Sequence, residues 1–429
     1  MSEVLTKTQR AVLWYPPAYD IRVETIPVPN ILHPDDAIVK IKLSGLCGSD
    51  LHVYRGHEDV HDPLVCGHEF VGEVVALGPS FTPTSQGRPE LYATLRIGDK
   101  VVSPFTISCG ECQFCRRGVT CRCIHSQLFG IPNLPGGQAQ YVRVPKAGGT
   151  LFKVDSITSS LSSGQDQVIT DSSLLLLADI LPTGVFAVLQ ALQHPKISPF
   201  INGVPYPFNS YLPDAVASSQ PTTLSLQDRT LTLAVVGLGP VGVCATVSLL
   251  ELLSDVHGID YRIVAVDMNP SRREKMQAVL AAMSPSTKVD TVKVADIPEA
   301  KDTVALWTNG IGCNAVLEIV GNNSALSLAY ELVGPFGLIS SVGVHQAPQL
   351  PLTGREVYDK NVSFDFGRCP VRSMFPTAAS ILLKRQDVFG GVGETASLIE
   401  KVVSFDSAVD AYEAFDKGRC GKILFDPWM

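Results

Sequence analysis

The sequence predicts an α/β protein with two domains, one rich in β-strands and one built around a doubly wound parallel sheet. Its 429 residues exceed the size at which one hydrophobic core usually keeps growing. Residues 11–144 alternate short β-branched runs with Gly, Pro and Asp, a pattern typical of short strands joined by turns. From Leu231 onward, buried-strand runs alternate with segments of helical period, which favours a parallel sheet covered by helices.

In the β-rich part, the clearest predicted strands are AIVKIKLSG at 37–45, FVGEVVALG at 70–78 and DKVVS at 99–103. Each is a β-branched run bounded by turn-forming residues. The polar segment 81–95 lies between the second and third strands and contains several strand breakers. We interpret it as a surface insertion.

The parallel-sheet part begins with one βαβ unit, in which LTLAVVG is a strand, VCATVSLLELL has helical period and YRIVAVD is the next strand. NAVLEIVG and GLISSVGV predict further strands of the same sheet, with ALSLAYELV as the helix between them. The alternation of strand and helix patterns is lost after His345. We therefore expect one domain over 1–190 and 346–429, and another over 191–345.

The segment 194–230 is rich in Pro, Ser and Asn, lacks a clear period and is too long for an ordinary connection. We interpret it as an insertion in the second domain. A solvated excursion, a subunit contact and a substrate lid are all compatible with its composition.

Composition and charge exclude several classes of protein. The net charge of −8 and the absence of a dense Lys/Arg block argue against nucleic acid as a partner, since phosphate binding needs a basic surface. The N-terminus lacks the pattern of a signal peptide, and no stretch reaches the roughly 18 apolar residues of a membrane span. We expect a cytoplasmic protein without membrane contact. Eleven cysteines, an odd number, fit a disulfide framework badly.

Four cysteines stand close together in the pattern C-x2-C-x2-C-x7-C: Cys109, Cys112, Cys115 and Cys123. Four thiolates at these separations can close on one ion and leave no open position, which predicts a structural zinc site. Accidental cysteine richness or redox pairing is the alternative. Cys121 competes for the fourth position, and the spacing from Cys115 favours Cys123.

A second candidate metal site comprises Cys47, His68 and Asp179. A thiolate, an imidazole and a carboxylate leave a fourth tetrahedral position for water or substrate, as a catalytic zinc requires. Each residue alone is a weak signal, but two neighbours strengthen the set. Asp50 can orient the imidazole of His68, and Glu69 can act as an alternate or transient ligand.

Ser49 and His52 lie in the same loop as Cys47. A hydroxyl followed by an imidazole offers a path for a proton from a buried metal to solvent. The alternative is that both are turn residues that satisfy the local backbone.

A Gly-rich loop follows the first strand of the βαβ unit and precedes its helix. Its amides and the helix N-terminus would face a pyrophosphate. Asp267 ends the next strand, where a carboxylate can meet ribose hydroxyls and repel a 2′-phosphate, so NAD is favoured over NADP. Arg272 and Arg273 can soften that preference. A Rossmann-like methyltransferase is the competing interpretation, but its chemistry requires no Cys/His/Asp metal site. The loop comprises Gly237, Leu238, Gly239, Pro240, Val241 and Gly242.

Over nearly its whole length the chain resembles the zinc-containing medium-chain alcohol dehydrogenases. The resemblance rests on four motifs: GHE at 67–69, the four-cysteine loop, GGQAQYV at 136–142 and GLGPVG. The resemblance implies a GroES-like catalytic domain and a Rossmann dinucleotide-binding domain, with the zinc in the cleft between them. Asp179, within DILPTG, and the motif SDLH are similar to the glutathione-independent formaldehyde dehydrogenase and polyol dehydrogenase branches.

This resemblance implies that Cys47, His68 and Asp179 hold a catalytic zinc, that Ser49 and His52 relay a proton, and that the four-cysteine loop holds a structural zinc. Two insertions, 81–95 and 194–230, are longer than the family norm. Cys66 stands where the family commonly has an aliphatic residue, and we interpret it as buried packing.

The implied function is hydride transfer between a primary or secondary alcohol, or the corresponding aldehyde or ketone, and NAD. Two zinc ions per chain and a homodimer or homotetramer are expected. A zinc-free quinone or enone reductase on the same fold is one alternative, against which the Cys47, His68 and Asp179 set counts. A binding or regulatory relative without turnover is the other.

Overall fold

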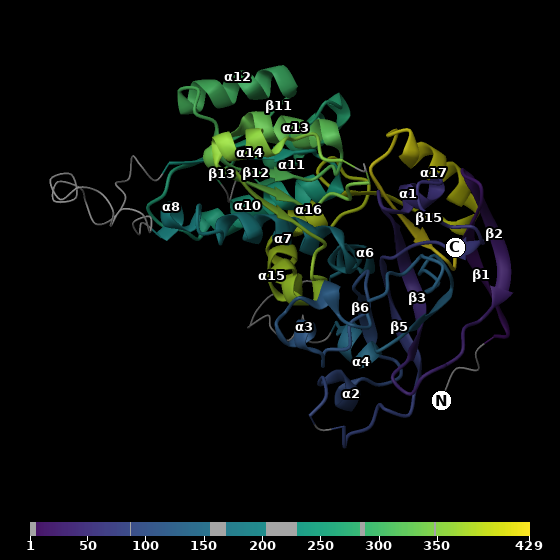
Figure 1. Ribbon diagram of the computed structural model, residues 1–429. Coiled ribbons are helices and arrows are strands. Elements are labelled where there is room, and N and C mark those ends of the chain that lie inside the picture. Colours follow the sequence, from purple (N-terminus) through teal and green to yellow (C-terminus); the bar gives the residue numbers. More distant parts are fainter. Residues whose placement is uncertain (1–5, 86, 155–168, 203–229, 284–287, 347–348) are drawn as a thin grey trace. The chain divides into compact units, whose positions relative to one another are not determined.

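The computed structural model describes residues 6–429 except 86, 155–168, 203–229, 284–287 and 347–348 (Figure 1). The chain forms two compact units. Unit 1 comprises Met1–Pro182 and Cys369–Met429, so both ends of the chain contribute to it, and unit 2 comprises Thr183–Arg368. The first is built on mostly antiparallel sheets and the second on a parallel sheet with helices, which confirms the expected α/β class.

Unit 1 contains a three-stranded antiparallel sheet in the order β2-β1-β4 and a seven-stranded sheet in the order β15-β16-β3-β5-β6-β8, with β7 paired to β3. The last strand, β16, pairs antiparallel with β3 and parallel with β15, which ties the end of the chain to its beginning. The strands are β1 (Thr8–Tyr15), β2 (Asp20–Pro27), β3 (Ala37–Leu46), β4 (Leu64–Val65), β5 (Phe70–Leu77), β6 (Lys100–Ser103), β7 (Tyr141–Val144), β8 (Phe152–Lys153), β15 (Ile399–Ser404) and β16 (Lys422–Asp426).

Helices surround these sheets, and four clusters of buried hydrophobic residues lie in the described part of unit 1. Helix α7 runs across the boundary between the two units. The helices are α1 (Asp50–Tyr54), α2 (Leu91–Thr94), α3 (Gln113–Arg116), α4 (Ala147–Thr150), α6 (Asp171–Leu175), α7 (Ile180–Leu192), α15 (Val371–Lys384), α16 (Gln386–Phe389) and α17 (Ala408–Asp416), with 3-10 turns η1 (Thr120–Arg122), η2 (Leu176–Ala178) and η6 (Phe405–Ser407).

Unit 2 is built on a six-stranded parallel sheet in the order β11-β10-β9-β12-β13-β14. Every residue of β9 is buried. Because side chains alternate between the two faces of a strand, both faces of the sheet are covered at this central position. The strands are β9 (Leu231–Val236), β10 (Tyr261–Val266), β11 (Val292–Ala295), β12 (Cys313–Glu318), β13 (Val333–Ser341) and β14 (Ser363–Phe366).

Three helices of unit 2, α12, α13 and α14, begin at side chains that satisfy their first amides. Asp296 accepts from the Glu299 amide at the start of α12, and Asn322 accepts from the Ala325 amide at the start of α13. Thr353 forms a capping box with Glu356 on α14. The helices are α8 (Ser198–Asn202), α10 (Pro240–Ser254), α11 (Pro270–Met283), α12 (Ile297–Thr308), α13 (Asn323–Leu332) and α14 (Gly354–Lys360), with the 3-10 turn η5 (Val289–Thr291).

The unit boundaries differ from the expected domain boundaries at 190 and 345. Unit 2 extends to Arg368 because β14 adds to the parallel sheet beside β13. The first boundary falls at Pro182, within the first turn of α7. The assignment of 346–368 to the catalytic domain was therefore wrong.

The segment 81–95 is only partly a surface insertion, and its second half is packed into unit 1. Tyr92 and Leu95 are fully buried, and Phe81 packs at 5.0 Å from the Tyr92 ring. These apolar contacts correct the expectation that the whole segment is a surface insertion. Residues 203–229 of the second insertion lie outside the described residues.

No single helix in the described part of the chain is both long and apolar enough to cross a membrane. Asp171–Ala178 and Ile180–Leu192 reach that length only together, with a bend of 46° between them.

Candidate functional site

The first site is organised by Asp50, at the start of α1. Cys47 follows β3 directly, and its amide donates to Asp50 Oδ2 over 2.9 Å. The other carboxylate oxygen, Oδ1, lies 3.2 Å from Nδ1 of His68. One carboxylate therefore fixes the loop that carries Cys47 and the ring of His68, which leaves Nε2 of His68 for another partner.

The structure brings together the three residues expected to hold the catalytic zinc. Asp179 Oδ2 lies 3.5 Å from Cys47 Sγ and 3.4 Å from His68 Nε2. All three side chains are buried, and they come from the end of β3, the turn before β5 and the turn between η2 and α7. One ligand atom of each, together with one of Glu69, lies within 4.8 Å of all the others.

Glu69 is part of a buried ion pair that sequence reasoning missed. Its Oε2 accepts from Nζ of Lys422, the first residue of β16, and both side chains are 1% exposed. The other oxygen, Oε1, is buried without a hydrogen-bond partner among the described residues. A Cβ at Gly45 would lie 2.0 Å from Oε2, so only glycine permits this placement. A lysine directly before the apolar run Ile-Leu-Phe of β16 was the available signal.

The electrostatics of this site favour a cation. Burial lowers the pKa of His68, but Asp50 and Asp179 outweigh it and hold that pKa well above its usual value. Burial, followed by the charge of Glu69, raises the pKa of the Cys47 thiol. Buried charges need partners, and within the described residues three carboxylates here face one ammonium and the imidazole of His68. A divalent cation that accepts thiolate, imidazole and carboxylate ligands together, as zinc does, fits this donor set.

Ser49 and His52 lie at the start of α1, beside Cys47. Ser49 is the N-cap residue of the helix, and both side chains are half-buried. The His52 ring lies 6.4 Å from the ring of exposed His57, which sequence reasoning did not single out. His52 is thus half-buried and next to an exposed imidazole, and the relay role of Ser49 and His52 stays a prediction.

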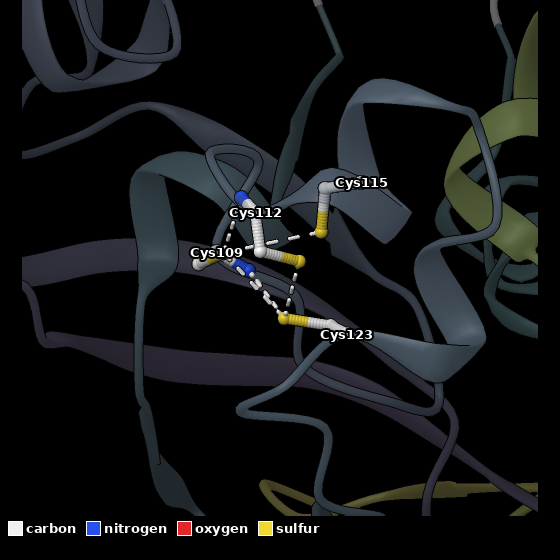
Figure 2. A group of neighbouring side chains, drawn as sticks. All are labelled: Cys109, Cys112, Cys115 and Cys123. Carbon is white, nitrogen blue, oxygen red and sulfur yellow. Dashed lines mark hydrogen bonds between the residues drawn. The ribbon is translucent and has the colours of Figure 1, made fainter.

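The four cysteines predicted as structural ligands converge on one point (Figure 2). The Sγ atom of Cys109 lies 3.5 Å from that of Cys123 and 3.9 Å from that of Cys115, and Cys112 lies 3.9 Å from Cys123. Tetrahedral Zn–S bonds of about 2.3 Å place sulfurs roughly 3.8 Å apart, so the geometry fits zinc. Cys121 does not belong to this group.

Backbone amides support these thiols. The amides of Glu111 and Cys112 each donate to Cys109 Sγ over 3.3 Å, and the amide of Cys109 donates to Cys123 Sγ over the same distance. Such contacts stabilise thiolate, the form that binds metal.

Arg88, from the insertion 81–95, clamps the cysteine loop to the rest of unit 1. Its guanidinium donates to Asp35 over 2.9 and 3.0 Å and to Glu111 over 2.6 Å. It also lies 3.7 Å from the centre of the Tyr92 ring. Because Glu111 stands between two of the cysteines, this contact positions the cysteine loop.

In unit 2, the Gly-rich loop has the form of a phosphate cradle. Gly237 has a φ of +98°, and a Cβ at Gly242 would lie 1.8 Å from the carbonyl oxygen of Gly237, so both positions require glycine. A Cβ at Gly239 would meet only Arg272, at 4.0 Å. Gly239 is the N-cap residue of α10, and Pro240 opens that helix. The open backbone and helix N-terminus fit a pyrophosphate.

Asp267 follows β10 and contacts this loop. Its Oδ2 accepts from the Leu238 amide over 2.8 Å and lies 3.5 Å from Nη1 of Arg272. Its Oδ1 accepts from the Asn269 amide over 2.8 Å. Asp267 thus shapes the loop, and Arg272 partly balances its charge.

Comparison with known proteins gives a match to the alcohol dehydrogenase GroES-like domain over residues 33–156. Zinc-type alcohol dehydrogenase B from Aspergillus flavus is 35% identical over 417 residues, which cover 97% of this chain and 81% of that protein. The chain belongs to the zinc-type alcohol dehydrogenase family. Another relative in this family, formaldehyde dismutase from Pseudomonas putida, is 26% identical over 95% of each chain.

The solved alcohol dehydrogenase from Thermus sp. ATN1 has a TM-score of 0.72 and 27% identity to this zinc-type alcohol dehydrogenase family member. The match covers 97% of this chain and 99% of that one. The expected medium-chain alcohol dehydrogenase fold, with its GroES-like domain, is thereby confirmed.

Proposed function

We propose that this protein is an NAD-dependent zinc alcohol dehydrogenase with two zinc ions per chain. The observation that carries the proposal is the convergence of Cys47, His68 and Asp179, three buried ligand types that leave a tetrahedral position open. The four-cysteine group fits a second, closed site. The substrate is a primary or secondary alcohol, or the corresponding aldehyde or ketone.

In this reaction the carbinol carbon loses a hydride and the hydroxyl loses a proton. Zinc held by Cys47, His68 and Asp179 would act as a Lewis acid that makes the hydroxyl proton easier to remove. Asp50 keeps Nε2 of His68 directed at the site through its contact with Nδ1. Ser49 takes the substrate proton and passes it to His52, which releases it to solvent.

The Gly-rich loop of unit 2 would hold the dinucleotide, whose nicotinamide ring would supply the hydride acceptor. The amides at the start of α10 hold its pyrophosphate, and the Asp267 carboxylate holds the adenosine ribose. A 2′-phosphate would meet the negative charge of Asp267, so NAD is preferred over NADP, and Arg272 moderates the preference. We place the active protein in the cytoplasm as a homodimer or homotetramer.

A His68→Ala variant tests the proposal. It should lose turnover on an alcohol and aldehyde panel and drop from two to one zinc per chain, while NADH binding persists. His61→Ala, whose side chain is 84% exposed, is the matched control and should behave as the unsubstituted protein. Retained turnover in His68→Ala would contradict the assignment.

The cofactor assignment has its own test. Asp267→Ser should lower the affinity for NAD. The ratio of the NAD affinity to the NADP affinity should fall as well. An unchanged ratio would show that the ribose is held elsewhere.

A further inference from the structure

A cluster of three polar side chains in unit 2 lies at the carboxyl ends of β12 and β13. Glu318 ends β12, Ser341 ends β13, and His345 follows shortly after. Glu318 Oε2 accepts from the Ser341 hydroxyl over 2.7 Å and lies 3.0 Å from Nε2 of His345, which is also 2.9 Å from the hydroxyl. The proposed mechanism uses none of these residues.

The cluster fixes the orientation of the His345 ring. Glu318 is fully buried, and its other oxygen accepts from the amides of Val320 and Gly321, each over 2.8 Å. Because Nε2 faces a carboxylate, it carries the hydrogen in the neutral ring, which makes Nδ1 an acceptor. Phe366 packs edge-on against the ring, with 5.3 Å between ring centres.

The Nδ1 atom of His345 is buried and has no hydrogen-bond partner among the described residues. The whole side chain is 11% exposed. A buried acceptor without a partner costs free energy. Since Glu318 and Ser341 nevertheless hold the His345 ring with Nδ1 in this position, we infer that a ligand supplies the missing donor. A catalytic Ser-His-Glu arrangement is not indicated, because Ser341 is 1% exposed and donates to the carboxylate itself.

The place of the cluster in the sheet identifies the ligand. The strand order runs β10-β9-β12-β13, so the Gly-rich loop after β9 has Asp267 on one side and the cluster on the other. Val320 joins the two, since a Cβ at Gly237 would lie 2.5 Å from a Val320 methyl group. A dinucleotide centred on the loop with its adenosine ribose at Asp267 extends its other half across β12 and β13.

We propose that Nδ1 of His345 accepts a hydrogen bond from the nicotinamide half of the dinucleotide. Glu318 and Ser341 hold the ring in place for this contact. Both a ribose hydroxyl and the carboxamide N–H of that half are donors of the required kind. The inference rests on the proposed NAD-dependent function and adds a cofactor-binding residue to it.

The test compares the affinity of three probes, NADH, ADP-ribose and ADP, by calorimetry on the zinc-loaded protein. His345→Phe keeps the packing on Phe366 but removes both ring nitrogens. This variant should lower the affinity for NADH about tenfold, the size expected for one lost hydrogen bond, and leave the affinity for ADP unchanged. His345→Asn, which retains a polar group near the position of Nδ1, should recover most of the NADH affinity.

ADP-ribose distinguishes the two donors, because it has the ribose and lacks the carboxamide. If His345→Phe lowers the affinity for ADP-ribose as well, the contact is made by the ribose. If it lowers only the affinity for NADH, the contact is made by the carboxamide. Unchanged NADH affinity, or equal losses for NADH and ADP, would overturn the inference. If the unsubstituted protein binds neither NADH nor ADP, the proposed function itself fails.

Discussion

The buried pair of Lys422 and Glu69 makes a quantitative prediction about the stability of unit 1. Burial lowers the pKa of Lys422, but the Glu69 carboxylate raises it above its usual value, so the ammonium stays charged. Lys422→Met removes that charge and leaves a carboxylate that is 1% exposed. Breaking a buried pair in this way costs about 3–5 kcal/mol.

The Glu69→Gln/Lys422→Met double variant removes both charges and should recover much of the loss, because replacing both members of a buried pair is often nearly neutral. The measurement is urea unfolding followed by fluorescence and circular dichroism, with the zinc content held equal between variants. Trp14 is 1% exposed in unit 1 and reports on its unfolding.

Lys42→Met is the matched control, because Lys42 lies on β3, is 39% exposed and has its carboxylate partner, Glu73, 3.7 Å away. A surface pair of this kind contributes at most about 1 kcal/mol. Two results would refute the reasoning: a Lys422→Met variant no less stable than the control, or a double variant as unstable as Lys422→Met alone.

Two further predictions concern the cysteine loop and its support. Cys123→Ser should lower the zinc content from two to one per chain and Cys121→Ser should not, as measured with a chromophoric chelator; equal effects would reject the ligand assignment. The Arg88 guanidinium holds the pKa of Asp35 well below its usual range. An Asp whose pKa is depressed in the folded state stabilises the protein above its unfolded pKa of about 4, and this stabilisation is lost as the pH falls below that value. The unsubstituted protein should therefore be more stable than Asp35→Asn at neutral pH, and the difference in unfolding free energy should shrink in acid. A difference that does not vary with pH would be inconsistent with this ion pair.

Much of the architecture could be predicted because its signals are local. The strand β12 is a short apolar run, and α13 shows helical period beside it, so both are visible in a short window. The strand β14 was missed because Ser-Phe-Asp-Phe has little apolar character and sits at the edge of the sheet, where only its pairing with β13 identifies it. That omission moved the expected domain boundary.

The candidate site was predictable where residue type and spacing carry the chemistry, as for Cys47, His68 and the four cysteines. Lys422 was not predictable in this way, because it meets Glu69 across 353 positions of sequence. The clamp formed by Arg88 was hidden for a similar reason, since its partners lie in two other segments of unit 1. A charged residue in a polar segment gives no sign of the contacts it makes in the folded protein.

The pairing of β16, which carries Lys422, with β3 fixes the order in which parts of unit 1 can form during synthesis of the chain. Strand β3 leaves the ribosome almost four hundred residues earlier than β16, and the whole of unit 2 is synthesised between them. Unit 2 can acquire its fold while the earlier part of unit 1 still lacks a sheet neighbour. Glu69 therefore stays without its ammonium partner, Lys422, until the last strand has been synthesised.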